Sequence, residues 1–302
     1  MLKRSLQIGL AVFIGMNVWV VAGTFRDTIR FHSERAAECS WADVLRCRHE
    51  GLNPIAPNIQ KAVKVVGSDA NQRLLTTPLG SFWVGAKDLQ TLSVMITEQQ
   101  EGIYEIDGHG VHAGDIVLDC GANIGVYTRH ALALGAKQVI AIEPSPDTLE
   151  FLRRNLAPDI ASGKVVVYPK GVWNEPGELK LYHGYYSWSD SLVEVDRSDP
   201  TPVRVALTTI DLLVHELKLE RVDFIKMDIE GAERQALEGA RDTVNRFHPR
   251  MAVALEHLKG EAEELPQLIR QIWPEMRTKC GPCSMQLPSG KYRVQPQVVA
   301  AY

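Results

Sequence analysis

From residue 115 onward, short apolar runs alternate with segments whose apolar residues recur every three or four positions. The runs predict buried strands and the periodic segments predict amphipathic helices. The predicted strands are 115–120, 138–143, 164–168, 178–182, 203–207, 222–227 and 251–256, and the predicted helices are 124–134, 145–156, 209–217, 232–240 and 261–272. Strands that are apolar on both faces fit a sheet covered by helices on both sides. The pattern therefore predicts an α/β fold with a doubly wound, mostly parallel sheet.

The chain before this region follows a different pattern. A mostly apolar run, Leu6–Phe25, is about 20 residues long, which lets a helix cross the hydrocarbon core of a membrane. We expect a membrane anchor over residues 1–25, with a cleaved signal segment and an interfacial or buried helix as alternatives. Residues 26–106 are expected to form a linker and a small N-terminal extension. Residues 107–260 form the predicted α/β domain, and residues 261–302 a C-terminal helix and tail.

Charge and cysteine content narrow the class of protein. The formal net charge is −4, and no run of five or more Lys and Arg occurs, which argues against nucleic-acid binding. The five cysteines are too sparse for a disulfide framework. Cys280 and Cys283 have the spacing of a metal or redox half-site, which Cys39 and Cys47 could complete. We favour a loop with two unpaired thiols or a local disulfide, and expect no metal site.

A glycine-containing turn, Asp119-Cys-Gly121-Ala-Asn123-Ile-Gly125, directly follows the first predicted strand. Gly121 and Gly125 allow a tight turn and a close approach of the backbone to a ligand. Asp119, at the carboxyl end of the strand, could accept a hydrogen bond from a ligand's ammonium group. Because doubly wound folds bind ligands at the carboxyl ends of their strands, we predict a binding site formed by Asp119, Gly121, Asn123 and Gly125.

Glu143 ends the second predicted strand and extends this site. A carboxylate there can accept hydrogen bonds from both hydroxyls of a ribose. Nicotinamide-binding domains share this feature, but their Gly-x-Gly-x-x-Gly fingerprint requires a glycine where Asn123 stands. Asp119 would also place a negative charge against a pyrophosphate. We therefore favour a cationic ligand that carries an amino acid group, and an NAD-dependent oxidoreductase is the less favoured alternative.

Several stretches resemble the FkbM-type methyltransferase family. They are Asp119–Thr128, the turn Glu143-Pro-Ser-Pro146, Lys226-Met-Asp-Ile-Glu-Gly-Ala-Glu233, Gly171–Tyr182, Val205–Asp211 and Ala254–His257, and the resemblance covers approximately residues 95–260. It implies a class I methyltransferase fold, S-adenosylmethionine as cofactor, and transfer of a methyl group to a hydroxyl of a sugar or secondary metabolite. The tail beyond residue 260 matches nothing in that pattern.

Methyl transfer to a hydroxyl requires removal of its proton, and a positioned base contributes roughly 10²–10⁴-fold to such a step. Asp228 and Glu230 directly follow the strand 222–227, and His257 follows the strand 251–256. We predict these three residues as the catalytic group. Lys226 is expected to pair with an acid, and Glu233 has the simpler role of capping a helix. Two carboxylates from one loop are too few to claim a metal site.

The expected protein is thus an S-adenosylmethionine-dependent O-methyltransferase with a small-molecule or glycan acceptor. The alternative from another class is a catalytically inactive, membrane-tethered cofactor-binding module. Because S-adenosylmethionine is made in the cytosol, we expect a single-pass membrane protein with its catalytic domain on the cytosolic face. Basic residues on the two sides of the apolar run are nearly balanced and do not decide the orientation.

Overall fold

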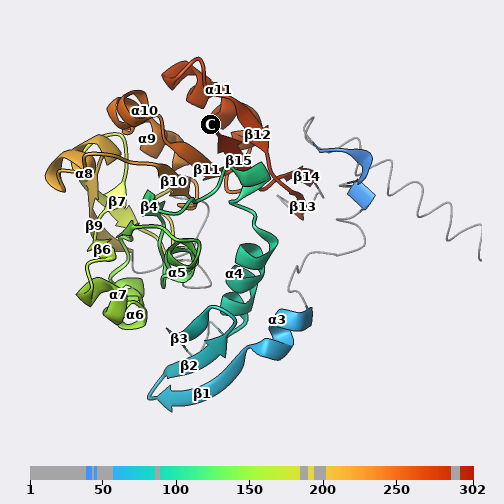
Figure 1. The fold of residues 1–302 in the computed structure, drawn as a ribbon, viewed down its shortest axis with the longest axis vertical. Coiled ribbons are helices and arrows are strands. Elements are labelled where there is room, and N and C mark those ends of the chain that lie inside the picture. The colour runs from blue at the N-terminus through green and yellow to red at the C-terminus, as the bar shows by residue number, and fades with distance from the viewer. Residues whose placement is uncertain are drawn as a thin grey trace, which may run out of the picture. The chain divides into compact units, whose positions relative to one another are not determined.

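The structure is a computed structural model that describes residues 39–42, 44–45, 57–85, 89–183, 190–193, 202–286 and 293–302. The chain divides into two compact units. The larger comprises Pro54–Gly281 and Gln297–Tyr302, and the smaller comprises Met1–Asn53 and Pro282–Pro296. Each unit is described by itself below, with the helices and strands labelled in Figure 1.

A seven-stranded sheet forms the centre of the larger unit. Its order is β12-β15-β11-β10-β4-β5-β6, with β4 (Ile116–Cys120), β5 (Gln138–Ile142), β6 (Val165–Tyr168), β10 (Phe224–Met227), β11 (Arg250–Ala254), β12 (Thr278–Cys280) and β15 (Val298–Ala301). The five strands from β11 to β6 are mutually parallel, and β15 is antiparallel to both of its neighbours. The predicted α/β fold with a mostly parallel sheet is confirmed.

The direction in which the sheet grows reverses beside β4. The chain proceeds from β4 to β5 and β6 on one side and later returns to place β10 and β11 on the other side. In such sheets the crevice at the carboxyl ends of the strands around the reversal point is the usual place for a ligand. The Gly121 turn follows β4 and Glu143 follows β5, so both predicted binding segments lie at this reversal point.

Side chains alternate between the two faces of the sheet, which explains why the strands are apolar throughout. Leu118 of β4 and Ile225 of β10 belong to a core cluster on one face, whereas Val117 and Phe224 belong to a cluster on the other. Helices cover both faces, as Figure 1 shows. They are α5 (Val126–Ala133), α6 (Pro146–Asn155), α7 (Ala157–Ala161), α8 (Ile210–Glu216), α9 (Glu233–Glu238), α10 (Arg241–Phe247) and α11 (Glu261–Ile272). A sheet buried in this way matches the predicted doubly wound arrangement.

A smaller sheet follows β6 in the chain. It consists of β7 (Gly171–Val172), β8 (Gly177–Leu181) and β9 (Val203–Thr208), in the order β7-β9-β8. Strands β8 and β9 are antiparallel and correspond to the predicted strands 178–182 and 203–207. A bridge between Tyr182 and Ser191 narrows the base of the intervening loop.

The N-terminal extension is more regular than the sequence suggested. It contains α3 (Pro57–Ala62), a meander of β1 (Lys64–Asp69), β2 (Gln72–Thr77) and β3 (Gly80–Gly85), the helix α4 (Leu89–Glu101), and a short 3-10 turn at Ile106–Gly108. Leu92 and Ile96 of α4 are fully buried against Phe82 of β3 and Val126 of α5. The extension is therefore packed onto the helix that follows the Gly121 turn.

Two expectations about the ends of the chain need correction. In the described part of the chain, no helix is long and apolar enough to span a membrane. This finding contradicts the predicted single-pass membrane location, because a spanning helix needs about 20 apolar residues and α4 has 13. The run 6–25 that carried the prediction lies outside the described residues. At the other end, β12 and β15 extend the central sheet where we expected only a helix and tail.

The smaller unit contains a hairpin of β13 (Cys283–Gln286) and β14 (Arg293–Pro296). Cys39 and Cys283 form a disulfide across 244 positions of sequence. This bond corrects the expectation of unpaired thiols or a local disulfide, and it removes two of the thiolates considered for a zinc site. Cys120 is buried and takes no part in this disulfide. Pairing between such distant cysteines cannot be deduced from their spacing.

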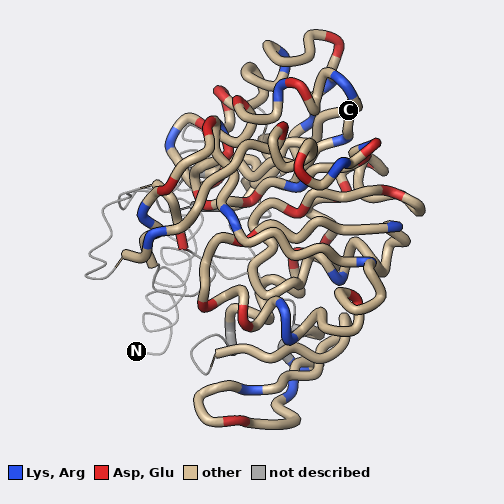
Figure 2. The backbone as a smooth tube through the Cα atoms, turned by 90° about the vertical axis from the view of Figure 1, so that its left-hand side faces the viewer, with Lys and Arg blue, Asp and Glu red and all other residues tan. Residues whose placement is uncertain are grey.

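The distribution of charge agrees with the composition. Figure 2 shows Lys and Arg interspersed with Asp and Glu along the described backbone, rather than gathered into one basic stripe. A stripe of that kind is the electrostatic signature of proteins that bind nucleic acid.

Candidate active site

A pocket lies at the carboxyl ends of β4, β5, β10 and β11. One part of its lining follows β5 and includes Asn123, Glu143 and Gly171; we call it the Glu143 end. The other part is lined by α4 and by the segments after β10 and β11, and we call it the Glu98 end. Its polar lining residues are Glu98, Gln99, Tyr104, Asp228, Glu230, Glu256 and His257. Gly121 and Lys226 also line the pocket.

The turn after β4 needs glycine for a steric reason. Gly121 has a φ of +80°, and a Cβ atom there would lie 2.0 Å from the carbonyl oxygen of Asp228. The Asp228 N–H in turn donates to the carbonyl of Cys120 at 3.2 Å. The turn is thus pressed against the loop after β10. Gly125 directly precedes α5, and a Cβ atom there would meet the side chain of Leu156; the glycine therefore serves packing and does not line the pocket.

Glu143 is held by two backbone donors at the Glu143 end. Its Oε2 accepts the N–H of Asn123 at 2.9 Å and its Oε1 accepts the N–H of Ser145 at 2.8 Å. The side chain is only 6% exposed, and this burial raises the pKa of Glu143 to about 7. Each carboxylate oxygen retains a further lone pair, so the group can accept two hydrogen bonds from adjacent hydroxyls of a ligand.

Asp119 does not reach the pocket. It is fully buried, its Oδ2 accepts a hydrogen bond from the Thr128 hydroxyl at 2.6 Å, and its Oδ1 lies 3.5 Å from Lys226 Nζ. The predicted contact between Asp119 and a ligand's ammonium group is therefore replaced by a contact with a lysine of the chain itself. Burial raises the pKa of Asp119, although the Lys226 charge opposes this effect.

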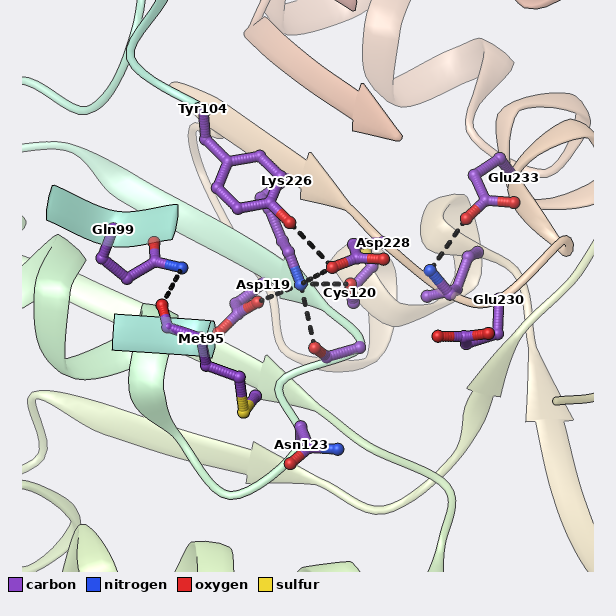
Figure 3. A network of polar contacts seen from close by, with 12 residues as sticks. Met95, Gln99, Tyr104, Asp119, Cys120, Asn123, Lys226, Asp228, Glu230 and Glu233 are labelled. Carbon is purple, nitrogen blue, oxygen red and sulfur yellow. Dashed lines mark hydrogen bonds and ion pairs between the residues drawn. The ribbon is translucent and has the colours of Figure 1, made fainter. Parts of the chain in front are cut away.

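Lys226 joins the two halves of the site (Figure 3). Its ammonium donates to the carbonyl of Gly121 at 2.9 Å and lies 3.7 Å from Oδ2 of Asp228. Burial would lower the pKa of Lys226, but Asp228 and Asp119 outweigh burial and raise it. The lysine is therefore charged, and it fixes the Gly121 turn relative to the loop after β10.

Asp228 is held ionised by its neighbours. The Tyr104 hydroxyl donates to Oδ2 at 2.7 Å, and Nε2 of His257 lies 3.3 Å from Oδ1. Burial would raise the pKa of Asp228, but Lys226 and His257 lower it below the ordinary value. The side chain retains 31% exposure. A carboxylate with a lowered pKa is a weak base, and it is well suited to hold a cation.

His257 is a cation rather than a base. Its Nδ1 lies 3.0 Å from Oε1 of Glu233, and its Nε2 lies 3.7 Å from Oε1 of Glu230. Burial would lower the pKa of His257, but Glu233, Asp228 and Glu230 raise it well above the ordinary value. The imidazole therefore carries its proton at neutral pH. This argues against the general-base role that the sequence suggested for His257.

Glu233 organises the loop after β10. Its Oε1 accepts the N–H of Ile229 at 2.8 Å and its Oε2 accepts the N–H of Gly231 at 2.9 Å. Between them Glu230 adopts a φ of +57°, a conformation that non-glycine residues rarely take. The loop is thus held in a strained shape, as is common at functional sites.

The atoms of Asp228, Glu233 and His257 that could bind a metal ion lie within 4.8 Å of one another. The sequence did not suggest this grouping. Both Glu233 oxygens already accept backbone N–H groups, and His257 holds a proton where a metal would need a lone pair. We interpret the cluster as a hydrogen-bonded ion network and assign no metal to it.

Helix α4 supplies residues that sequence reasoning missed. Glu98 lines the pocket, and Gln99 is 5% exposed, donates its Nε2 to the Met95 carbonyl at 3.1 Å, and leaves its Oε1 buried without a hydrogen-bond partner. The signal that could have revealed the helix was the spacing of Leu89, Leu92 and Ile96. From sequence, this region is assigned to the N-terminal extension without a predicted helix in it.

Comparison with known proteins identifies the family. The methyltransferase FkbM domain matches residues 119–281, which is more than half of the chain. The chain belongs to this family, as the sequence motifs indicated. Helix α4 and the meander before it lie outside the matched region.

Curated relatives match at low identity. The 2-O-methyltransferase NoeI of Sinorhizobium fredii is 27% identical over 152 residues, which cover 43% of this chain and 59% of that protein. Methyltransferase 1 of Beauveria bassiana is 28% identical over 167 residues, covering 48% of this chain and 66% of that protein. The matched part of this chain thus spans less than two thirds of the length of these relatives. A crystal structure of methyltransferase FkbM from Methylobacillus flagellatus KT shares 20% identity with a TM-score of 0.49, covering 72% of this chain and 56% of that chain.

Proposed function

We propose that this protein is an S-adenosylmethionine-dependent methyltransferase that methylates a hydroxyl group of a sugar, glycan or secondary metabolite. The observation that carries the proposal is the position of Glu143. Its buried carboxylate lies at the end of β5 beside the Gly121 turn, with both oxygens fixed by backbone N–H groups. Membership of the FkbM family and the 2-O-methyltransferase activity named for NoeI support the same reaction class.

The pocket fits this cofactor. Glu143 would accept hydrogen bonds from the two ribose hydroxyls, and Gly121 would let the methionine portion approach the backbone. Asp228, ionised and partly exposed, would hold the ammonium group in place of the buried Asp119. Asn123 closes the turn through its backbone N–H, which donates to Glu143. The unpartnered oxygen of Gln99 is a further acceptor that a ligand can satisfy.

When bound, S-adenosylmethionine supplies an activated methyl group on a sulfonium sulfur. The residues of this chain then contribute position and electrostatics. Asp228, Glu230 and Glu256 surround the Glu98 end with carboxylates, which favour a positively charged ligand before transfer. The positive charges of Lys226 and His257 offset the repulsion between these carboxylates.

Calorimetric titration with S-adenosylhomocysteine, and separately with NAD, tests the proposal. We expect S-adenosylhomocysteine to bind and Glu143→Ala to abolish binding, whereas Glu178→Ala, an exposed change on β8, leaves it unaltered. Binding of NAD alone would overturn the proposed cofactor and revive the oxidoreductase alternative. Binding of neither ligand would contradict the proposed cofactor, whereas binding of S-adenosylhomocysteine without any methyl transfer would favour the catalytically inactive module.

A further inference from the structure

The Glu98 end of the pocket contains one carboxylate that its surroundings do not use. The Glu98 carboxylate forms no hydrogen bond or ion pair with any residue that the structure describes, although the side chain lines the same cavity as Asp228, Glu230 and Glu256. Asp228 is bound by Tyr104 and lies beside two cations, and Glu143 is bound by two N–H groups. The Glu98 carboxylate is therefore available for a hydrogen bond or an ion pair with a bound ligand.

Its neighbour on the helix points to the same chemistry. The Gln99 amide donates to the Met95 carbonyl, so its oxygen must be the free atom, and this oxygen is buried without a partner (Figure 3). The Gln99 oxygen only accepts hydrogen bonds, and Glu98 in its ionised form does the same. A ligand at this end of the pocket must supply hydrogen-bond donors, which hydroxyl and ammonium groups do and phosphate or carboxylate groups do not.

We propose that Glu98 is a catalytic residue that binds the acceptor hydroxyl and takes its proton, and that the acceptor is an uncharged or positively charged hydroxyl compound. This inference rests on the proposed function. In the step, the O–H bond breaks and its proton moves to a Glu98 oxygen. The freed oxygen bonds to the methyl carbon, and the electron pair of the methyl–sulfur bond remains on sulfur.

Electrostatics distinguish this role from that of holding the cofactor's ammonium group. Burial raises the pKa of Glu98 well above its ordinary value, and the neighbouring charges of Asp228, Glu256 and Glu101 add to the rise while Lys226 opposes it. A base is most effective when its pKa lies near the working pH. An ammonium group is held better by a permanently ionised acid, and Asp228, with its lowered pKa, is that acid.

The charge at this end also restricts the acceptor. Four carboxylates, those of Glu98, Asp228, Glu230 and Glu256, line it together with the cations Lys226 and His257. Both cations are already paired with acids of the site. An anionic acceptor would meet like charges at short range, which disfavours its binding.

The experiment follows tritium transfer from labelled S-adenosylmethionine to four methyl hexosides of matched size: the glucoside, the 2-amino-2-deoxyglucoside, the glucuronide and the glucoside 6-phosphate. We expect transfer to the first two only. Glu98→Gln should lower kcat by about 10²-fold or more and remove the acidic limb of the pH profile, because a general base contributes roughly 10²–10⁴-fold. Affinity for S-adenosylhomocysteine should stay within about threefold, since less than 1 kcal/mol of binding energy is involved.

Gln100→Ala is the matched control, because Gln100 lies on the same helix, is exposed, carries no charge and does not line the pocket, and its kcat should equal that of the unaltered protein. Preferred transfer to the glucuronide or the phosphate, or no transfer to either of the first two hexosides, would overturn the inferred acceptor class. Full activity of Glu98→Gln would overturn its role as base, and loss of S-adenosylhomocysteine affinity would make Glu98 a cofactor ligand. If the unaltered protein fails to bind S-adenosylhomocysteine, the proposed function itself fails.

Discussion

The two ends of the pocket are built in different ways. The Glu143 end comes mainly from one continuous stretch, residues 121–145, with Gly171 added from the segment after β6, and backbone N–H groups there hold the Glu143 carboxylate. The Glu98 end is assembled from three distant segments: α4, the loop after β10 and the loop after β11. It depends on buried charges that neutralise one another. The geometry of a continuous stretch is largely determined by its local sequence. The Glu98 end, in contrast, forms only when the fold brings distant segments together.

The largest effect is expected where the two ends touch, at Gly121. Gly121→Ala places a Cβ atom 2.0 Å from the Asp228 carbonyl oxygen and forces a side chain into a φ of +80°. We expect a loss of more than about 4 kcal/mol in the free energy of unfolding, together with loss of S-adenosylhomocysteine binding. Urea denaturation and calorimetry measure the two effects.

Gly163→Ala is the matched control for this substitution. Gly163 has a φ of +74°, but no atom lies within 4 Å of the added Cβ. It should therefore show only the cost of the left-handed backbone, about 1–2 kcal/mol. If Gly121→Ala and Gly163→Ala lower the free energy of unfolding by the same amount, the close contact with the β10 loop does not explain the need for glycine at residue 121.

The next effect tests the charge balance of the Glu98 end. Lys226→Met leaves Asp119 and Asp228 without their shared cation, which should cost about 3–5 kcal/mol of stability. Without Lys226 the pKa of Asp119 rises further above its unfolded value, so protonation stabilises the folded variant. The deficit should therefore grow as pH increases, and denaturation at several pH values would reveal this slope.

Adding Asp119→Asn to Lys226→Met should restore part of the loss, because one unpaired carboxylate is removed. Lys170→Met removes a lysine that is paired with Glu216 at the surface, and it should change stability little. A deficit for Lys226→Met that does not vary with pH would contradict the proposed pairing of the buried charges.

A smaller effect belongs to Glu143. Its pKa of about 7 is raised from 4.5, so the charged form is disfavoured in the folded protein, and the stability derived from this group falls as pH rises from 4.5 to 7. Ribose hydroxyls donate to the ionised form, so S-adenosylhomocysteine affinity should increase as pH rises through 7. Glu143→Gln should weaken binding by about 10–100-fold, or 1.4–2.8 kcal/mol, and abolish this pH dependence in calorimetric titrations.

The smallest effect is expected at Asn123. Its backbone N–H donates to Glu143, whereas its side-chain oxygen accepts the N–H of Ile124. Asn123→Gly relieves a φ of +50° and loses that local bond, so we expect stability to change by less than about 1 kcal/mol. Affinity for S-adenosylhomocysteine should be retained. Loss of binding, measured by calorimetry, would show that the side chain itself contacts the ligand.

Much of the larger unit could be predicted from sequence, because its strands and helices carry their own periodicity. The expected helix 261–272 coincides with α11, and the strands from β4 to β11 lie within or one residue from their expected ranges, except the two-residue β7, which was not predicted. Strands β12 and β15 could not be assigned, since short terminal segments become strands only by pairing with β11 and with each other.

The parts of the site that depend on neighbouring residues in the sequence could be predicted, and those that depend on distant residues could not. Gly121 and Asn123, predicted from the turn after the first strand, and Glu143, predicted from the end of the second, all line the pocket, and their role in binding stays a prediction. The ionisation of His257 and the burial of Asp119 were not predictable, because both depend on partners more than 20 and 100 residues away, Glu233 and Lys226. A local sequence pattern does not predict which carboxylate will pair with which cationic side chain.

The position of β15 has a consequence for how this protein can be made. This strand, Val298–Ala301, lies between β11 and β12 and is therefore an interior strand of the sheet. While a ribosome is still translating the preceding residues, the backbone of β11 has no partner on that side and its apolar side chains Met251–Ala254 lack their final cover. Such an unpaired edge is a template for association between chains. The nascent protein therefore passes through an interval in which the strands β4 to β11 are present and this side of the central sheet is still open.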